Sequence, residues 1–359
     1  MYDKPHTYDG RSLHEHQHPT VHIRGRQWSE EQTLHVATPY TNPFRWNTRR
    51  RLLEDFRRHM AGSANVKLHV GELAYGDRPW EVTEPHHPHD IQLRTRHELW
   101  HKENLGNRII QHFDPDWKYG ALIDGDFHFT RHDWALETVQ MLQHFDFVQL
   151  FSTYSDLGPD HRPRHVRPSF AARWVRGELT AETQFHQGYD DLSRTLNHVK
   201  VNGVGTTGGA WAFRREAFEK VGGLLDVCIL GSGDWHMAFG LIGEPDTHPN
   251  VRLMTETTNS YAEAIKAWQN RAARAIRKNI GVVQCHAVHH FHGDKANRKY
   301  GERWKVLRDT KYNPHVDIFR DSQGIWQLSP ERPEIRDAIR GYFMGRNEDD
   351  VSVTQPPIA

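Results

Sequence analysis

Two aspartates separated by a glycine, Asp124 and Asp126, follow a short apolar run at residues 118–123. The run predicts a buried strand, so the acids lie just past its C-terminal end, where open α/β sheets bind their ligands. Gly125 lets the backbone turn closely enough for both carboxylates to face one point. Hard oxygen donors suit a divalent cation that bridges phosphates. Asp-Gly-Asp turns are also common on protein surfaces that bind no cation. Other stretches of the sequence must therefore support the prediction of a cation site.

Three later stretches carry further groups suited to chemistry. Gly208 and Gly209 permit the close approach of a ligand and precede an alternating run at 210–213. Asp234 follows Gly-Ser-Gly, where it can cap a helix. His290 and His292 come after a strand-like run at 281–285, and either can face a cation, although an ordinary buried or surface histidine is the simpler interpretation of both.

Hydrophobic patterning predicts an α/β fold. Strands are expected at 33–38, 66–70, 118–123, 145–151, 210–213 and 281–285, and helices at 45–60, 94–113, 131–144, 214–221 and 262–279. Strand, helix and strand in succession imply parallel βαβ units. Residues 39–43 and 73–90 are expected as loops, and 152–205 as a long excursion from the sheet. The chain lacks G-x-G-x-x-G after its first strand and lacks a P-loop, which argues against both nucleotide-binding folds that need them.

The composition excludes a global electrostatic attraction to nucleic acid. The 359 residues include 46 Lys and Arg against 46 Asp and Glu, so a polyanion would have to meet a local basic surface. Two such surfaces are expected, at 161–176 with Phe170 and Trp174, and at 266–278. No apolar run approaches the roughly 20 residues that span a bilayer, so no membrane partner is expected. Two isolated cysteines and a polar N-terminus favour the cytoplasm.

In their order along residues 33–300, these stretches resemble the GT-A nucleotide-sugar glycosyltransferases. The inverting family-2 and β-1,4-galactosyltransferase-like enzymes are nearest in motif order. A series of motifs in the right order is more specific than any one of them. The matching stretches are Thr38-Pro39-Tyr40 with PFRWNTR at 43–49, Glu72, KENLGN at 102–107, Asp124-Gly125-Asp126, the two-glycine segment 208–223, GSGDW at 231–235 and HGDKANR at 292–298.

The resemblance implies a GT-A fold, a mixed sheet flanked by helices, and an inverting hexosyl transfer from a UDP-sugar. It implies Mn²⁺ or Mg²⁺ on Asp126 and Asp124, with His292 or its rival His290, and Asp234 as the general base. Gly233 departs from the family, which has a glutamate there that contacts the acceptor. The implied donor-binding residues are Thr38, Pro39, Tyr40, Arg45, Glu72, Lys102, Asn107, Asp124, Gly208 and Gly209.

The expected organisation is an irregular arm at 1–30, a catalytic domain at 31–300 and a helical extension with a frayed acidic tail at 301–359. Within the domain, 31–150 would bind the nucleotide and 151–300 the acceptor. The pattern at 292–304 also resembles phage-encoded glycosyltransferases, which suggests a hydroxymethylated pyrimidine of phage DNA as acceptor, in a bacterial or infected-host cytoplasm. A glycan, protein or small-molecule acceptor is the alternative. A sugar-nucleotide-binding module without catalysis, favoured by Gly233, is another, and the oligomeric state is left open.

Overall fold

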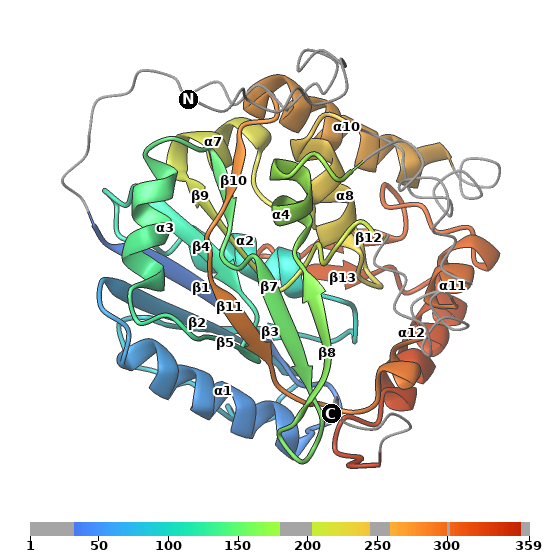
Figure 1. Ribbon diagram of the computed structural model, residues 1–359. Helices are drawn as coiled ribbons and strands as arrows, with labels where there is room; N and C mark the ends of the chain where they lie inside the picture. The colour runs from blue at the N-terminus through green and yellow to red at the C-terminus, as the bar shows by residue number, and fades with distance from the viewer. Residues whose placement is uncertain (1–31, 180–202, 245–258, 300–301, 353–359) are drawn as a thin grey trace, which may run out of the picture.

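The computed structural model describes residues 32–179, 203–244, 259–299 and 302–352, and its centre is a seven-stranded sheet (Figure 1). The strand order is β10-β6-β9-β4-β1-β2-β3, and β9 alone runs antiparallel to its neighbours. This mixed α/β sheet confirms the expected fold class. The strands are β1 Leu34–Thr41, β2 Val66–Tyr75, β3 Asp90–Thr95, β4 Tyr119–Ile123, β6 Phe147–Gln149, β9 Ala210–Arg214 and β10 Ile280–Val282.

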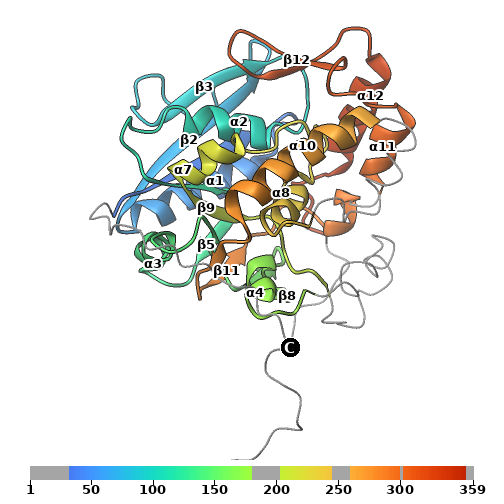
Figure 2. The ribbon, with the colours of Figure 1, turned by 90° about the horizontal axis from the view of Figure 1, so that it is seen from above.

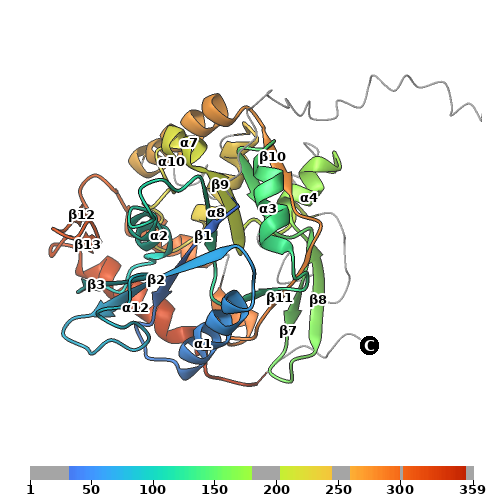
Figure 3. The same cartoon turned by 90° about the vertical axis from the view of Figure 1, so that its left-hand side faces the viewer.

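Helices cover both faces of this sheet, each with its own apolar core. Figure 3 shows α2 (Lys102–Ile110), α7 (Arg215–Val221) and α10 (Asn259–Ile276) on one side, with α1 (Asn47–Ala61) and α3 (Trp134–Leu142) on the other. One core joins Leu105, Phe213 and Trp268, and the other joins Phe56 and Trp134. The side chains of β4 divide between the two, Leu122 into one and Ala121 with Ile123 into the other, because successive strand residues face opposite ways.

A second sheet lies beside the first. It was not predicted from the sequence, because residues 152–205 were expected to form an excursion from the sheet. Its order is β5-β11-β7-β8, with β5 Phe127–Phe129, β11 His286–His289, β7 Thr153–Leu157 and β8 Pro163–Pro168. Strands β7 and β8 are rich in polar residues, and prolines bound β8, which is why they do not read as strands. The prolines are tolerated because β8 is an edge strand. Helix α4 (Phe170–Val175) follows directly.

Several predicted boundaries were wrong. Strands β1 and β2 extend through Thr41 and Tyr75, because their last residues continue the pairing with neighbouring strands. The helix expected at 94–113 is shortened to α2, and β3 precedes it. The strand expected at 281–285 is replaced by β10 and β11, which join different sheets. Asp234 is the second residue of α8 (Gly233–Leu241), so the N-cap position expected for it belongs to Ser232.

The C-terminal region folds back on the rest of the chain. Figure 2 shows α11 (Arg303–Asp309) and α12 (Pro333–Gly345) together at one end of the molecule, with the hairpin β12 (Ile318–Arg320) and β13 (Trp326–Leu328) between them in sequence. The predicted fraying from 345 is wrong for residues 346–349, since Glu348 is only 1% exposed. The arm predicted at 1–30 lies outside the described residues. None of the described helices has the length and apolarity needed to cross a bilayer.

Three buried histidines make the stability of this fold sensitive to acid. Burial lowers the pKa of His69 to about 3, that of His101 to about 4 and that of His236 to about 3. In the unfolded chain each binds a proton near its ordinary pKa of about 6.5. Between these values the unfolded state therefore holds more protons, and stability falls as the pH falls.

We expect each of these three histidines to lower the free energy of unfolding by about 1.4 kcal/mol per pH unit around pH 5. His128, whose pKa burial also lowers to about 3, adds to the slope. Urea titrations at pH 7, 6 and 5 in the presence of chelator measure it. His69→Gln should make the slope shallower by about 1.4 kcal/mol per pH unit, and the exposed His86→Gln should leave it unchanged. Equal slopes in wild type and His69→Gln would contradict the assignment.

Candidate active site

The Asp-Gly-Asp turn directly follows β4, where the sheet ends. The amide of Asp124 donates to the carbonyl of Gly209 at 2.9 Å, and the carbonyl of Asp126 accepts from the amide of His290 at 2.9 Å. The turn is therefore held between the start of β9 and the end of β11. Thr38 lies against Gly125, and its buried hydroxyl has no hydrogen-bond partner among the described residues. A buried hydroxyl without a partner at a strand end is a natural contact for a bound ligand.

Lys102, the first residue of α2, neutralises the first of the two aspartates. Its ammonium lies 2.6 Å from Oδ1 and 2.7 Å from Oδ2 of Asp124. Burial favours loss of the lysine proton, but Asp124 and Glu103 outweigh it and raise the pKa of Lys102. Burial also raises the pKa of Asp124, against the pull of Lys102. With both oxygens on the ammonium, Asp124 is engaged with Lys102 and does not join the cation cluster described next.

Asp126 forms a compact cluster with two histidines. Its Oδ2 lies 3.0 Å from Nε2 of His292 and 3.6 Å from Nε2 of His289, and the two Nε2 atoms are 3.4 Å apart. One ligand atom from each residue falls within 4.8 Å of the others. Two imidazoles and a carboxylate are donors that suit Mn²⁺ or Zn²⁺. The other oxygen of Asp126 is buried and has no hydrogen-bond partner in the described part of the chain, which fits a cation that would complete its environment.

Both histidines present Nε2 to this point, where Nε2 of His292 also lies 2.8 Å from Nη2 of Arg298. Nδ1 of His289 lies 2.8 Å from Oδ1 of Asp156, its register partner on β7, and Nδ1 of His292 lies 3.4 Å from Oε2 of Glu348. A carboxylate on Nδ1 directs the Nε2 lone pair toward a metal and strengthens the ligand. Burial opposes a charge on His289, but Asp126 and Asp156 raise its pKa to about 9. Burial also opposes the charge on Asp126, yet the two histidines hold its pKa well below its usual range.

His290 points away from this cluster, although the sequence made it the rival of His292. Its Nε2 lies 3.2 Å from Nδ1 of His128, whose ring stacks on that of His59 at 4.6 Å. His289 takes the place beside Asp126 instead. The missed signal is strand parity: β11 runs through His289, so His289 shares the buried face with Ala287 and the next residue faces the opposite side.

Glu348 was not among the predicted site residues. Its two oxygens accept from Nε and Nη2 of Arg49 at 2.6 and 2.7 Å, and from Nε of Arg346 at 2.6 Å. The next residue, Asp349, accepts from the amides of Asn47 and Thr48 at the start of α1. Burial opposes the charge of Glu348, but the two arginines hold its pKa well below its usual range. The C-terminal segment thus ties the start of α1 to His292.

Glu348→Gln should lower Mn²⁺ affinity by about tenfold, because a neutral amide orients and polarises His292 less than a carboxylate does. It should also lower the free energy of unfolding by about 3 kcal/mol, since two buried guanidinium groups lose their counter-charge. Titration calorimetry and urea unfolding measure the two effects. Asp349→Asn is the matched control: it weakens the contact with α1 and leaves metal affinity unchanged. Equal Mn²⁺ affinity in Glu348→Gln and wild type would remove the positioning role.

Asp234 lies close to the Lys102–Asp124 pair. If residue 208 carried a Cβ atom, that atom would overlap Oδ2 of Asp234, so only glycine permits this approach. Oγ1 of Thr207 lies 3.4 Å from the same oxygen. The charge of Asp234 contributes to the raised pKa of Lys102 and of Asp124, which confirms their proximity. Its Oδ1 accepts from the amide of the following residue. Asp234 is half-buried, and it is a carboxylate available for proton transfer.

Glu103 occupies the space next to the glycine that departs from the family pattern. A Cβ at Gly233 would lie 3.1 Å from both Cδ and Oε1 of Glu103. Glu103 is 3% exposed, and burial, with the nearby charge of Asp234, raises its pKa to about 8 despite Lys102. A carboxyl group is therefore present beside Gly233. It belongs to Glu103 of α2 and not to residue 233.

Most of the other residues predicted to bind the donor contact Glu81 or the loop that carries it, and Asn107 contacts Leu224 instead. Glu72 accepts from the amides of Glu81, Val82 and Thr83 and so holds the 76–89 loop in place. Tyr40 donates to Glu81 at 2.8 Å, Arg45 lies 3.3 Å from the same carboxylate, and Pro39 is a residue of β1. Asn107 bonds Leu224 through both ends of its amide, away from the Asp-Gly-Asp turn. The residues that the structure brings together are Thr38, Lys102, Asp124, Asp126, Gly208, Gly209, Asp234 and His292.

No protein-family model and no curated protein matches the chain. Solved structures match it in part. The catalytic domain of Drosophila β-1,4-galactosyltransferase 7, bound to xylobiose, is 15% identical with a TM-score of 0.30, and the match covers 58% of this chain and 59% of that one. A mannosyltransferase from Pyrobaculum calidifontis, bound to GDP-mannose and Mn²⁺, is 14% identical with a TM-score of 0.34, over 86% and 69%. At these identities and scores the likeness does not extend to activity or substrate.

Proposed function

We propose that the protein is a GT-A-type, metal-dependent, inverting glycosyltransferase that uses a nucleotide sugar, with UDP-sugar as the expected donor. The observation that carries the proposal is the convergence at one sheet edge of the Asp126–His289–His292 cluster, the Lys102–Asp124 pair and Asp234. These groups provide a cation site, a fixed positive charge and a base. The catalytic region comprises 31–300 together with Glu348 from the C-terminal extension.

Asp126, His289 and His292 would hold the divalent cation, and of the two expected ions, Mn²⁺ and Mg²⁺, the imidazole donors favour Mn²⁺. When bound, the cation would neutralise the charge that develops on the leaving nucleoside diphosphate. Lys102 supports the same role as a fixed ammonium near the diphosphate, and the buried hydroxyl of Thr38 has a free hydrogen-bonding capacity toward the nucleotide. The set includes His289 because its nitrogen, and not that of His290, faces Asp126.

Asp234 would take the proton of the acceptor hydroxyl as its oxygen attacks C1 of the donor sugar. The new C1–O bond forms while the bond from C1 to the diphosphate oxygen breaks, and the diphosphate leaves with the electron pair. A single displacement inverts the anomeric centre. Glu103, protonated or not, lies beside Asp234 and can hydrogen-bond the acceptor where the family uses a glutamate at the position of Gly233.

The expected acceptor surfaces are only partly supported. Phe170 is fully buried against Phe239, and Trp174 lies under Lys278, so neither offers an open face for stacking bases. Arg162 and Arg167 remain as partly exposed cations, and Arg167 lies 3.9 Å from Asp156, the carboxylate that holds His289. They support an anionic acceptor, of which a hydroxymethylated pyrimidine in DNA is one case; a glycan, protein or small molecule is the alternative.

Calorimetry with a panel of nucleotide sugars, with and without Mn²⁺, tests the donor before the acceptor is known. We expect one uridine sugar to bind only with the metal and to be slowly hydrolysed to UDP. Binding without hydrolysis would favour a sugar-nucleotide-binding module that has lost catalysis. No binding of any nucleotide sugar in the presence of Mn²⁺ would overturn the proposal.

A further inference from the structure

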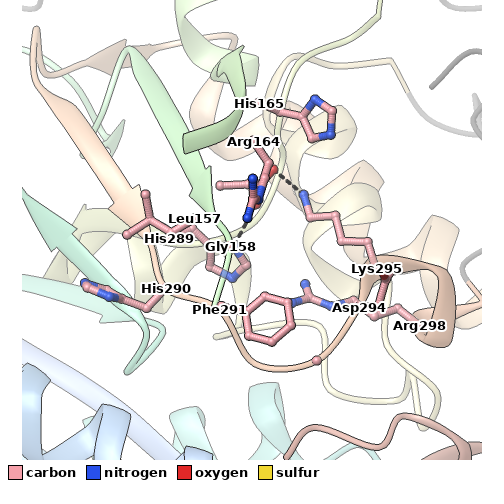
Figure 4. A pocket seen from close by; sticks show the side chains of 12 residues that line it. Leu157, Gly158, Arg164, His165, His289, His290, Phe291, Asp294, Lys295 and Arg298 are labelled. Atoms are coloured by element: carbon pink, nitrogen blue, oxygen red, sulfur yellow. Dashed lines mark hydrogen bonds and ion pairs between the residues drawn. The ribbon is translucent and has the colours of Figure 1, made fainter. Parts of the chain in front are cut away.

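A small pocket lies on the far side of His289 from Asp126, between the β7–β8 hairpin and the segment that runs from His289 to Arg298. Its cavity is about 40 Å³, which holds about three ordered waters. Figure 4 shows the side chains of Arg164, Lys295 and Arg298 pointing into it. The pocket and the cation cluster therefore share the imidazole of His289 as a common wall.

Arg164 is buried in this pocket with much of its hydrogen-bonding capacity unused. The residue is 9% exposed, and its Nη2 lies 2.7 Å from Asp160, which is itself largely exposed. Nε and Nη1 are buried and have no hydrogen-bond partner among the described residues. A Cβ at Gly158 would overlap the guanidinium, so the chain leaves room for the arginine there. A permanently charged group with two unsatisfied N–H groups requires acceptors that the described chain does not provide.

The charges around the pocket favour an anionic group with several oxygens. The lining supplies three cations, Arg164, Lys295 and Arg298, against the acids Asp156 and Asp294. Asp156 is occupied by His289 and Lys295, and Asp294 caps the amide of Ala296. Guanidinium and ammonium groups that converge on a space of this size are typical of phosphate recognition.

We propose that this pocket binds a phosphoryl group of the acceptor substrate, next to the cation site and separate from the diphosphate of the donor. The assignment to the acceptor rests on the proposed function, whereas the binding of phosphate itself does not. It gives a role to one arginine of the basic stretch at 161–176: Arg164 is built into a pocket beside the reacting centre, whereas Arg173 is buried against Glu178 and Arg162 stays at the surface. An acceptor phosphate held there would lie on the opposite side of His289 from the leaving group.

Inorganic phosphate is the probe, titrated calorimetrically into the whole protein with saturating Mn²⁺ and UDP. Phosphate should bind in their presence, and Arg164→Gln should weaken it by about tenfold or more, as expected for charge-assisted hydrogen bonds. UDP affinity should stay unchanged. Arg162→Gln, an exposed arginine of the same hairpin, is the matched control and should have no effect.

Competition between phosphate and UDP, or an equal loss of UDP affinity in Arg164→Gln, would overturn the proposal by assigning the pocket to the donor. Unchanged phosphate affinity in Arg164→Gln would overturn it too. If that variant does not fold, Lys295→Gln, at a half-exposed position, should weaken phosphate binding in its place. Failure of every nucleotide sugar to bind would reject the proposed function and leave the phosphate result standing on its own.

Discussion

Replacing His289 by alanine is expected to lower Mn²⁺ affinity by about 100-fold or more, because a site with three protein ligands loses one of them. His292→Ala should have an effect of the same size, and transfer should fall with it. His290→Ala, one residue further along, should change Mn²⁺ affinity by no more than about threefold, since its ring contacts His128 outside the cluster. The comparison of His289→Ala with His290→Ala distinguishes the loss of a metal ligand from the effect of removing any imidazole in this segment.

Calorimetric titration of Mn²⁺ into chelator-treated protein measures the three variants, and transfer assayed over a range of Mn²⁺ concentrations gives an independent value. Circular dichroism establishes that each variant is folded. Equal losses in His289→Ala and His290→Ala would mean that the cluster is not the cation site. Full transfer in excess chelator would reject the metal requirement altogether.

Asp234→Asn is expected to reduce transfer by about a thousandfold, the usual size of the loss when a general base is removed. The asparagine keeps the size and the contact with Thr207 but cannot accept the acceptor's proton. Donor binding should not weaken, since Asp234 is not in the cation cluster and its charge opposes that of a diphosphate. The change should therefore appear in kcat and not in the affinity for UDP-sugar with Mn²⁺.

Asp133→Asn is the matched control, because Asp133 is also an acid at the start of a helix, α3, and its exposed carboxylate pairs with Arg131 and not with the site. It should leave transfer unchanged. Normal transfer by Asp234→Asn would remove Asp234 as the base and direct attention to Glu103. Loss of donor binding together with transfer would indicate a structural role for Asp234 at the start of α8.

The local order of residues was sufficient to predict six of the seven strands of the central sheet, all but β3, and the acids at its edge. Alternating apolar patterns marked β1, β2 and β4, and the glycines before β9 marked a close approach that Gly208 indeed makes to Asp234. These features depend on periods of two or 3.6 residues and on backbone freedom, which are properties of short stretches. The α/β class and the Asp-Gly-Asp turn beyond β4 follow from such patterns, whereas the place of Asp234 in the site was implied only by the family resemblance.

Contacts between distant segments decided the rest. Which histidine faces Asp126 depends on the parity of β11, and that parity is set by pairing with β5 and β7. The sequence does not reveal these strands, because β5 is only three residues long and β7 is largely polar. Glu348 reaches His292 only because the C-terminal segment returns to the start of α1, about 300 residues away in sequence. The carboxyl absent at Gly233 is supplied by Glu103 from another helix. Local patterns thus determined which groups are available for chemistry, whereas tertiary packing chose their partners, because a side chain's neighbours across a sheet or between helices leave no periodic trace in the sequence.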